Sequence, residues 1–125
     1  MPRLLLVEDN ELNSDALGRL LARRGFTVLH APDGPAALEM AERDRPDLVL
    51  LDIGLPGMDG HEVARALRLR PATAKVPIIA LTAHATAADR AAALESGCDD
   101  FEVKPVAIAS LTARIESLLG RRPRP

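Results

Sequence analysis

The 125-residue chain has almost no aromatic residues: it contains no Trp, no Tyr, and only Phe26 and Phe101. Proteins that bind single-stranded nucleic acid commonly stack bases on aromatic side chains, so this class of binding is not expected. The formal net charge is −2, which gives no reason to expect nucleic acid or an anionic membrane as the main partner.

Cysteine, clustered histidine and long apolar runs are also scarce. Cys98 is the only cysteine, which excludes an internal disulfide and fits a reducing compartment. His30, His61 and His84 are far apart in the sequence, so a zinc site is not expected. The apolar run at residues 4–7 is too short for a signal peptide or a membrane span. We therefore expect a cytoplasmic protein.

The residues that are present suit one globular α/β domain. The chain is 47% hydrophobic and 27% charged, close to globular averages, and its length suits a single core. Five short apolar runs alternate with five helical patterns, which is typical of a parallel sheet with crossover helices. The runs cover residues 4–7, 26–30, 48–51, 78–81 and 100–103. We assign residues 1–120 to the domain and the basic residues 121–125 to a disordered tail.

The helical patterns predict which faces are buried. The first helix, which ends before Gly25, is expected to face the core with Leu12, Ala16, Leu17, Leu20 and Leu21. The fourth helix, residues 86–96, offers only alanines and Leu94 for burial, so we expect it to dock weakly and shift easily. The last helix is expected to stop at Gly120.

Strand composition suggests the order of the sheet. The first, third and fourth runs are continuously apolar, as expected when helices cover both faces. The second and fifth runs include Thr27, His30, Asp100 and Glu102, as expected for strands at the sheet edges. This favours the order 2-1-3-4-5 of a doubly wound, flavodoxin-like sheet.

Polar residues stand where these strands end. Glu8 and Asp9 follow the first, Asp52 the third, Thr82 the fourth and Lys104 the fifth. The carboxyl ends of parallel strands share one edge, so these groups should meet there. Two carboxylates about 4 Å apart repel by about 4 kcal/mol at an effective dielectric near 20, so the cluster needs a cation or raised pKa values. The pattern predicts a site for Mg²⁺ and phosphate oxygens.

Four segments resemble the receiver domains of two-component response regulators, which have the CheY-like fold. They are residues 7–10 (VEDN), 51–60 (LDIGLPGMDG), 81–83 (LTA) and 97–105 (GCDDFEVKP). The resemblance implies that Asp52 is the phosphoacceptor. It further implies that Asp9, Asp52 and the backbone carbonyl of Gly54 bind Mg²⁺ directly, and that Glu8 acts through water.

The resemblance also implies the parts of a switch. Lys104 is expected to pair with the phosphoryl group and Thr82 to move to hydrogen-bond it. Phe101 is expected to change rotamer from exposed to buried. The bond between Lys104 and Pro105 is expected to be cis, a state that proline makes accessible.

These roles predict a single-domain response regulator, because no residues remain after Gly120 for an output domain. A sensor histidine kinase or a histidine phosphotransfer protein would phosphorylate it. Phosphorylation would change the binding of an effector through the face formed by the fourth helix, fifth strand and fifth helix. We expect a monomer or a weak phosphorylation-dependent dimer.

Several alternatives remain open. The domain could be a phosphorelay intermediate, a single-domain regulator of the DivK type, or a receiver-like binding module that is not phosphorylated. Asn13 and His84 are expected near the rim of the pocket, where solvated surface roles are also possible. A turnover phosphatase is disfavoured because Gly54 stands where haloacid-dehalogenase-like enzymes carry a second Asp. A flavin or nucleotide module is disfavoured because it would need a phosphate-binding loop after the first strand, where Glu8 and Asp9 would repel phosphate unless a metal is bound.

Overall fold

Five parallel strands form the centre of the computed structural model, which describes residues 2–55, 57–83 and 86–120. They are β1 (Arg3–Val7), β2 (Thr27–Ala31), β3 (Leu48–Asp52), β4 (Ile78–Thr82) and β5 (Asp100–Val103). Their order is β2-β1-β3-β4-β5, which confirms the predicted sheet. The expectations for His84 and for residues 121–125 lie outside the described residues.

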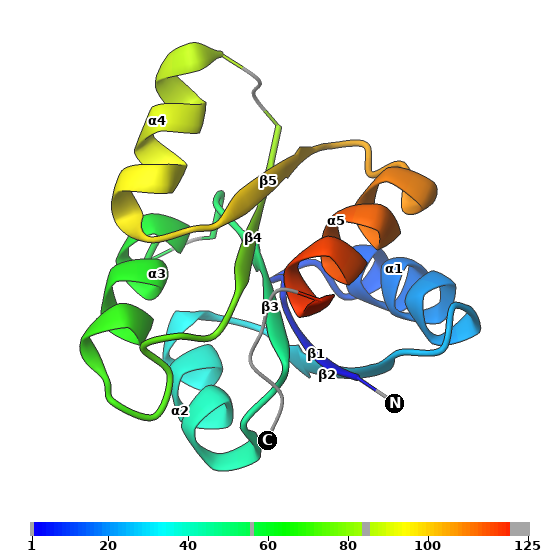
Figure 1. Cartoon of the computed structure of the whole chain (residues 1–125), viewed down its shortest axis with the longest axis horizontal. Helices are drawn as coiled ribbons and strands as arrows, with labels where there is room; N and C mark the ends of the chain where they lie inside the picture. Colours follow the sequence, from blue (N-terminus) through cyan, green and yellow to red (C-terminus); the bar gives the residue numbers. More distant parts are fainter. Residues whose placement is uncertain (1, 56, 84–85, 121–125) are drawn as a thin grey trace.

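Five helices cover the two faces of the sheet. They are α1 (Glu11–Arg23), α2 (Gly34–Asp44), α3 (Gly60–Leu69), α4 (Ala87–Ser96) and α5 (Ile108–Gly120). Helices α2, α3 and α4 lie on one face, and α1 and α5 lie on the other (Figure 1). The last described residue of α5 is Gly120, where this helix was predicted to stop. In the described part of the chain, no helix has the length and apolarity needed to cross a membrane.

The sheet divides the core into two layers. Leu5, Val7, Val49 and Leu51 pack with α2, α3 and α4, whereas neighbouring leucines such as Leu4 pack with α1 and α5. Successive side chains of a strand point to opposite faces, which is why consecutive apolar residues serve both layers. Strands β1 and β3 therefore lie in the interior, and the polar residues that follow them are held by a rigid frame.

Two predicted core faces were partly wrong. In α1, Leu21 is buried, but Leu12 is 80% exposed and Leu20 is 40% exposed. Ala16 is exposed as well, and Leu12, Ala16 and Leu20, each four residues after the last, lie on one side of α1. The apolar residues of α1 extend around more of the helix than the surface that packs on the sheet, so this side stays in solvent. In α4, Leu94 is 56% exposed, and the buried residues are Ala93 and Ser96. The apolar contact of α4 is thus smaller than its sequence suggested.

Glu102 of β5 is also not an exposed edge residue. It is 7% exposed because α5 packs over it. Arg114 Nε donates to Glu102 Oε2 at 2.7 Å, and the Ser110 hydroxyl donates to the same oxygen at 3.1 Å. A buried carboxylate is tolerated when it is paired and hydrogen-bonded in this way.

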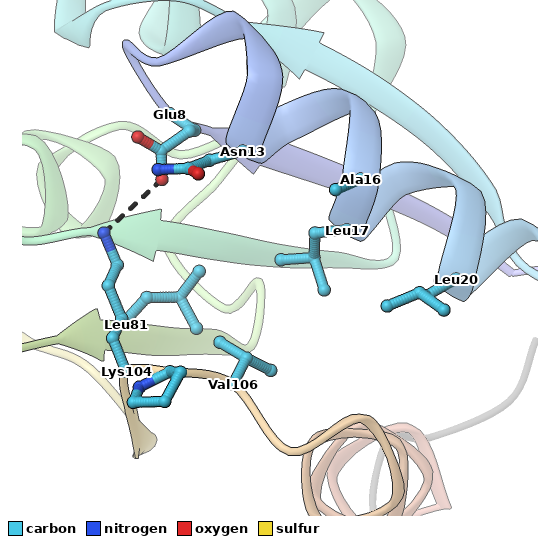
Figure 2. A pocket seen from close by; sticks show the side chains of 9 residues that line it. Glu8, Asn13, Ala16, Leu17, Leu20, Leu81, Lys104 and Val106 are labelled. Carbon is cyan, nitrogen blue, oxygen red and sulfur yellow. Dashed lines mark hydrogen bonds and ion pairs between the residues drawn. The ribbon is translucent and has the colours of Figure 1, made fainter.

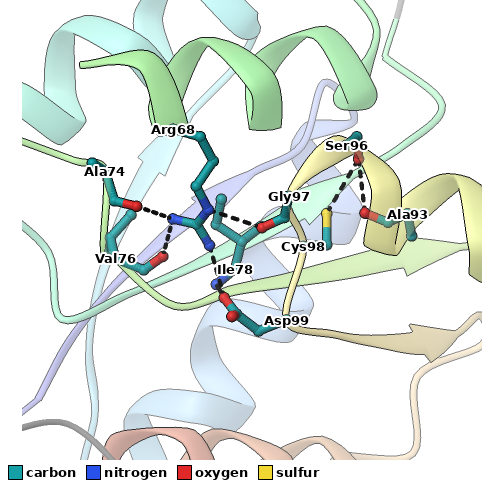
Figure 3. A network of polar contacts seen from close by, with 9 residues as sticks. All are labelled: Arg68, Ala74, Val76, Ile78, Ala93, Ser96, Gly97, Cys98 and Asp99. Atoms are coloured by element: carbon teal, nitrogen blue, oxygen red, sulfur yellow. Dashed lines mark hydrogen bonds and ion pairs between the residues drawn. The ribbon is translucent and has the colours of Figure 1, made fainter. Parts of the chain in front are cut away.

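The last turn of α3 carries an arginine that ties several segments together (Figure 3). The Arg68 guanidinium donates to the carbonyls of Ala74, Val76 and Gly97 at 3.1, 2.6 and 3.0 Å. It also forms an ion pair with Asp99 at 2.8 Å. This network joins the turn after α3, the end of α4 and the start of β5, and it lies at the opposite end of the strands from the acidic residues.

Candidate metal and phosphoryl site

The carboxyl ends of β1 and β3 bring three acidic side chains together. Glu8 and Asp9 follow β1, and Asp52 is the last residue of β3. One oxygen from each of the three lies within 4.8 Å of the others. Glu8 and Asp52 are each 5% exposed, whereas Asp9 is exposed. The structure thus brings together the acids that the strand ends predicted.

Lys104, which follows β5, reaches into this cluster. Its Nζ lies 3.1 Å from Asp52 Oδ2 and 3.4 Å from Glu8 Oε2; the second contact is drawn in Figure 2. Burial lowers the pKa of Lys104, but hydrogen bonding and attraction to Asp52 and Glu8 outweigh it and raise that pKa above its usual value. The ammonium group is therefore held charged beside the two buried carboxylates.

The electrostatics of Glu8 show that one lysine does not neutralise the site. Burial raises the pKa of Glu8, and the Asp52 carboxylate raises it further. The hydrogen bond from Asn10 N–H, at 3.2 Å, and the charge of Lys104 act in the other direction. Three acidic groups against one ammonium group leave an excess of negative charge that favours a cation.

The donor set of the cluster fits Mg²⁺. All three acids offer oxygen atoms, which this ion prefers, and the exposure of Asp9 leaves room for the waters that Mg²⁺ usually keeps. The Gly54 N–H donates to Asp52 Oδ1 at 2.9 Å and orients that carboxylate. That the Gly54 carbonyl binds Mg²⁺ directly remains a prediction.

Gly60 supports the site in a way that sequence reasoning missed. It is buried at the start of α3, and a Cβ there would lie 2.6 Å from Ile53 Cα and 2.7 Å from the Asp52 carbonyl oxygen. Its N–H donates to the Ile53 carbonyl at 3.2 Å. Only a glycine lets α3 begin against the backbone of Asp52. The sequence did contain a sign of this role. Gly60 stands in the first turn of a helix that Asp59 already caps, where a glycine is not needed for capping.

The predicted switch residues lie on β4, which is next to β3, and on β5, the edge strand that follows β4 in the sheet. Thr82 is the half-buried last residue of β4, and its carbonyl accepts the Lys104 N–H at 2.7 Å. Phe101 on β5 is half-buried. The guanidinium carbons of Arg90 and Arg114 lie 4.7 and 5.8 Å from its ring centroid. Phe101 therefore contacts both α4 and α5. The Lys104–Pro105 peptide bond is cis.

A cavity of about 500 Å³ opens beside the site, between α1 and the segment after β5 (Figure 2). Glu8, Lys104 and Asn13 line its polar end. Its apolar lining comes from Ala16, Leu17, Leu20, Leu81, Pro105 and Val106. The sequence did not predict this groove, because it depends on which face α1 leaves exposed.

Comparisons with known proteins agree with this geometry. The response regulator receiver domain family matches residues 4–116. The transcriptional regulatory protein AfsQ1 of Streptomyces coelicolor is 46% identical over 121 residues, which cover 97% of this chain and 52% of that protein. The response regulator PleD of Caulobacter vibrioides is 45% identical over 116 residues, 93% of this chain and 26% of that protein. The chain thus spans about a quarter to a half of these relatives.

Solved structures with the same fold are also similar along their whole length. A putative response regulator from Chloroflexus aurantiacus superimposes with a TM-score of 0.91 at 32% identity, covering 96% of this chain and 98% of that one. The receiver domain of the sensor histidine kinase PA1611 from Pseudomonas aeruginosa has a TM-score of 0.88 at 38% identity, covering 95% and 98%. That receiver domain has a magnesium ion coordinated in its active-site cleft.

Proposed function

Because the chain belongs to the response regulator receiver domains, which are phosphoacceptor signalling modules, we propose that it is a switch phosphorylated on Asp52. The observation that carries this proposal is the buried Asp52 carboxylate, with Glu8, Asp9 and the Lys104 ammonium group gathered around it. Because Asp52 is buried, its carboxylate does not serve merely as a solvated surface charge. Its place at the end of a strand holds it in a fixed position.

We propose that Asp9, Asp52 and the Gly54 carbonyl hold Mg²⁺, with Glu8 acting through water. The excess negative charge of the cluster supports this assignment, as does the magnesium ion described in the PA1611 receiver domain. When bound, the ion neutralises charge on the carboxylates and on the incoming phosphoryl group. Among the described residues, Lys104 supplies the positive charge that pairs with Asp52 and Glu8.

The proposed chemistry transfers a phosphoryl group to an oxygen of Asp52. An Asp52 oxygen attacks phosphorus, the bond from phosphorus to the donor's histidine nitrogen breaks, and the imidazole leaves with the electron pair. The Gly54 N–H fixes Oδ1, and Lys104 next to Oδ2 is placed to pair with the phosphoryl oxygens. The donor would be a phosphohistidine of a histidine kinase or of a histidine phosphotransfer protein. We propose that the reaction takes place in the cytoplasm, where ATP is available to phosphorylate such kinases.

The groove beside the site supports docking of a protein donor. Leu12 and Leu20 expose apolar surface on α1, and the cavity lining continues it to Pro105 and Val106. Exposed apolar surface next to charged groups is typical of protein interaction sites. We propose that the donor covers this surface while its histidine approaches Asp52.

We propose that the output face is formed by α4, β5 and α5. Phe101 contacts Arg90 of α4 and Arg114 of α5, so one ring links all three elements. Helix α4 has few buried residues, so little free energy is needed to change its position. Movement of Thr82 toward the phosphoryl group would let Phe101 turn inward and change its contacts with both arginines. Amide hydrogen exchange should then change in α4 and α5 on phosphorylation but not in α2; unchanged exchange in α4 and α5 would contradict this face.

Incubation with acetyl phosphate, with and without Mg²⁺, tests the central proposal. We expect a Mg²⁺-dependent phosphoryl adduct in the intact mass that is absent from Asp52→Asn. Asp15→Asn, an exposed acid on α1, is the matched control and should be labelled like the unchanged protein. If neither acetyl phosphate nor a phosphoramidate donor gives an adduct, phosphorylation of Asp52 is contradicted.

A further inference from the structure

The peptide that joins Glu8 to Asp9 is held by a side chain from the edge strand. The Glu8 N–H donates to the Ala31 carbonyl at 3.1 Å, which extends the β1–β2 ladder by one bond. In a regular parallel ladder, the Glu8 carbonyl would next accept from the N–H two residues after Ala31. Strand β2 ends at Ala31, and Asp33, the residue that would supply this N–H, is instead the N-cap of α2.

The imidazole of His30 takes the place of that missing donor. Its Nε2 lies 2.7 Å from the Glu8 carbonyl oxygen. A carbonyl only accepts hydrogen bonds, so Nε2 must carry the proton. Both polar groups of the Glu8 backbone are therefore bonded to β2, one by a carbonyl and one by a ring nitrogen.

We propose that His30 is a positioning residue for the metal site. The carbonyl that it holds belongs to the peptide between Glu8 and Asp9, two of the three acids of the cluster. Fixing this peptide plane fixes the backbone from which both carboxylates extend toward Asp52. It also directs the Glu8 carbonyl toward β2. The inference rests on the proposed Mg²⁺ site and adds a residue to it that touches neither the ion nor the phosphoryl group.

Sequence reasoning placed His30 only among the polar residues of an edge strand. Its bond spans 22 residues and depends on where β2 stops, so the pattern of the strand alone could not reveal it. Groups that orient metal ligands through one hydrogen bond typically change metal affinity by about 10- to 100-fold when they are lost. Because His30 acts on the backbone and not on a carboxylate, we expect an effect near the lower limit, about tenfold.

Calorimetric titration of the unphosphorylated chain with Mg²⁺ tests the inference. We expect His30→Leu to weaken Mg²⁺ binding about tenfold, since leucine fills the space without a donor. His30→Gln, whose amide can place an N–H near the position of Nε2, should bind within about twofold of the unchanged protein. His61→Gln is the matched control, because His61 bonds to Ser96 between α3 and α4, and it should bind Mg²⁺ normally.

The outcomes separate this inference from the proposed function. If the unchanged protein binds Mg²⁺ and a folded His30→Leu binds it equally well, or if His30→Gln is as impaired as His30→Leu, the positioning role is wrong and the Mg²⁺ site stands. If the unchanged protein does not bind Mg²⁺, both proposals fail. A ring-nitrogen NMR spectrum of the unchanged protein needs no variant: a proton on Nε2 agrees with the inference, and a proton on Nδ1 alone overturns it.

Discussion

Replacing Gly60 by alanine tests whether the phosphoacceptor strand depends on the start of α3. The added Cβ would lie 2.6 Å from Ile53 Cα and 2.7 Å from the Asp52 carbonyl oxygen. Both are backbone atoms, so no side-chain rotation can relieve the overlap. The helix and the end of β3 must move apart.

The expected cost follows from two opposing effects. Forcing extra volume into a packed region costs about 1–3 kcal/mol. Alanine gains up to about 1 kcal/mol over glycine inside a helix, and less at its first position. We therefore expect Gly60→Ala to lower the free energy of unfolding by about 1–2 kcal/mol. The displacement also moves the Asp52 backbone, and misplacing reacting groups by about 1 Å can slow a reaction roughly 100-fold.

Urea unfolding followed by circular dichroism measures the first effect, and phosphorylation by acetyl phosphate the second. Gly18→Ala is the matched control, because Gly18 lies within α1 and its Cβ would meet only Val28 Cγ1, at 3.9 Å. We expect this control to raise the free energy of unfolding by about 0.5–1 kcal/mol and to be phosphorylated normally. Equal stability and equal phosphorylation rates for Gly60→Ala and Gly18→Ala would show that Asp52 does not depend on the close approach of Gly60.

Three further predictions concern charge, thiol chemistry and the arginine network. Lys104→Met should tighten Mg²⁺ binding by roughly tenfold in calorimetry while slowing phosphorylation, because it removes a positive charge next to the site. Weaker Mg²⁺ binding would contradict this electrostatic effect, and Lys75→Met, at an exposed lysine, is the control. Burial raises the pKa of the Cys98 thiol, so the fold favours the protonated form and loses stability as the pH rises above the unfolded pKa. Alkylation of Cys98 by iodoacetamide at about pH 8 should therefore be at least about tenfold slower in the native than in the urea-unfolded protein, and equal rates would show that it is accessible. Arg68→Met should lower the free energy of unfolding, measured by urea unfolding, by about 3 kcal/mol, since three carbonyls and one carboxylate lose a charged donor. A loss no greater than that of Arg65→Met, at an exposed arginine, would contradict this.

The positions of Asp52, Glu8 and Asp9 could be predicted because they depend on short-range patterns. Glu8 and Asp9 follow one apolar strand and Asp52 ends another, and parallel strands place their carboxyl ends at one edge. Lys104 follows β5 in the same way and reaches Asp52 at 3.1 Å. The order of the sheet could be predicted as well, because edge strands carry polar residues that interior strands do not.

Other features were decided only when the elements packed against one another. The sequence predicted that α1 ends before Gly25 and that it is amphipathic, but the packing of α1 decided that Leu12 and Leu20 remain exposed. Glu102 looks like an edge residue until α5 covers it with Arg114. Residue patterns report the period of one helix or strand, whereas these outcomes depend on contacts between segments far apart in the chain.

The supporting residues of the site show the same division. The acidic groups themselves are visible in the sequence, since strand ends are local features. Gly60 and His30 are not, because one matters through an approach of two backbones and the other through a bond across 22 residues. The sequence by itself determined the fold and the chemical groups of the site. The tertiary structure alone decided what holds them in place, because close approach and hydrogen bonding depend on distances that no residue pattern contains.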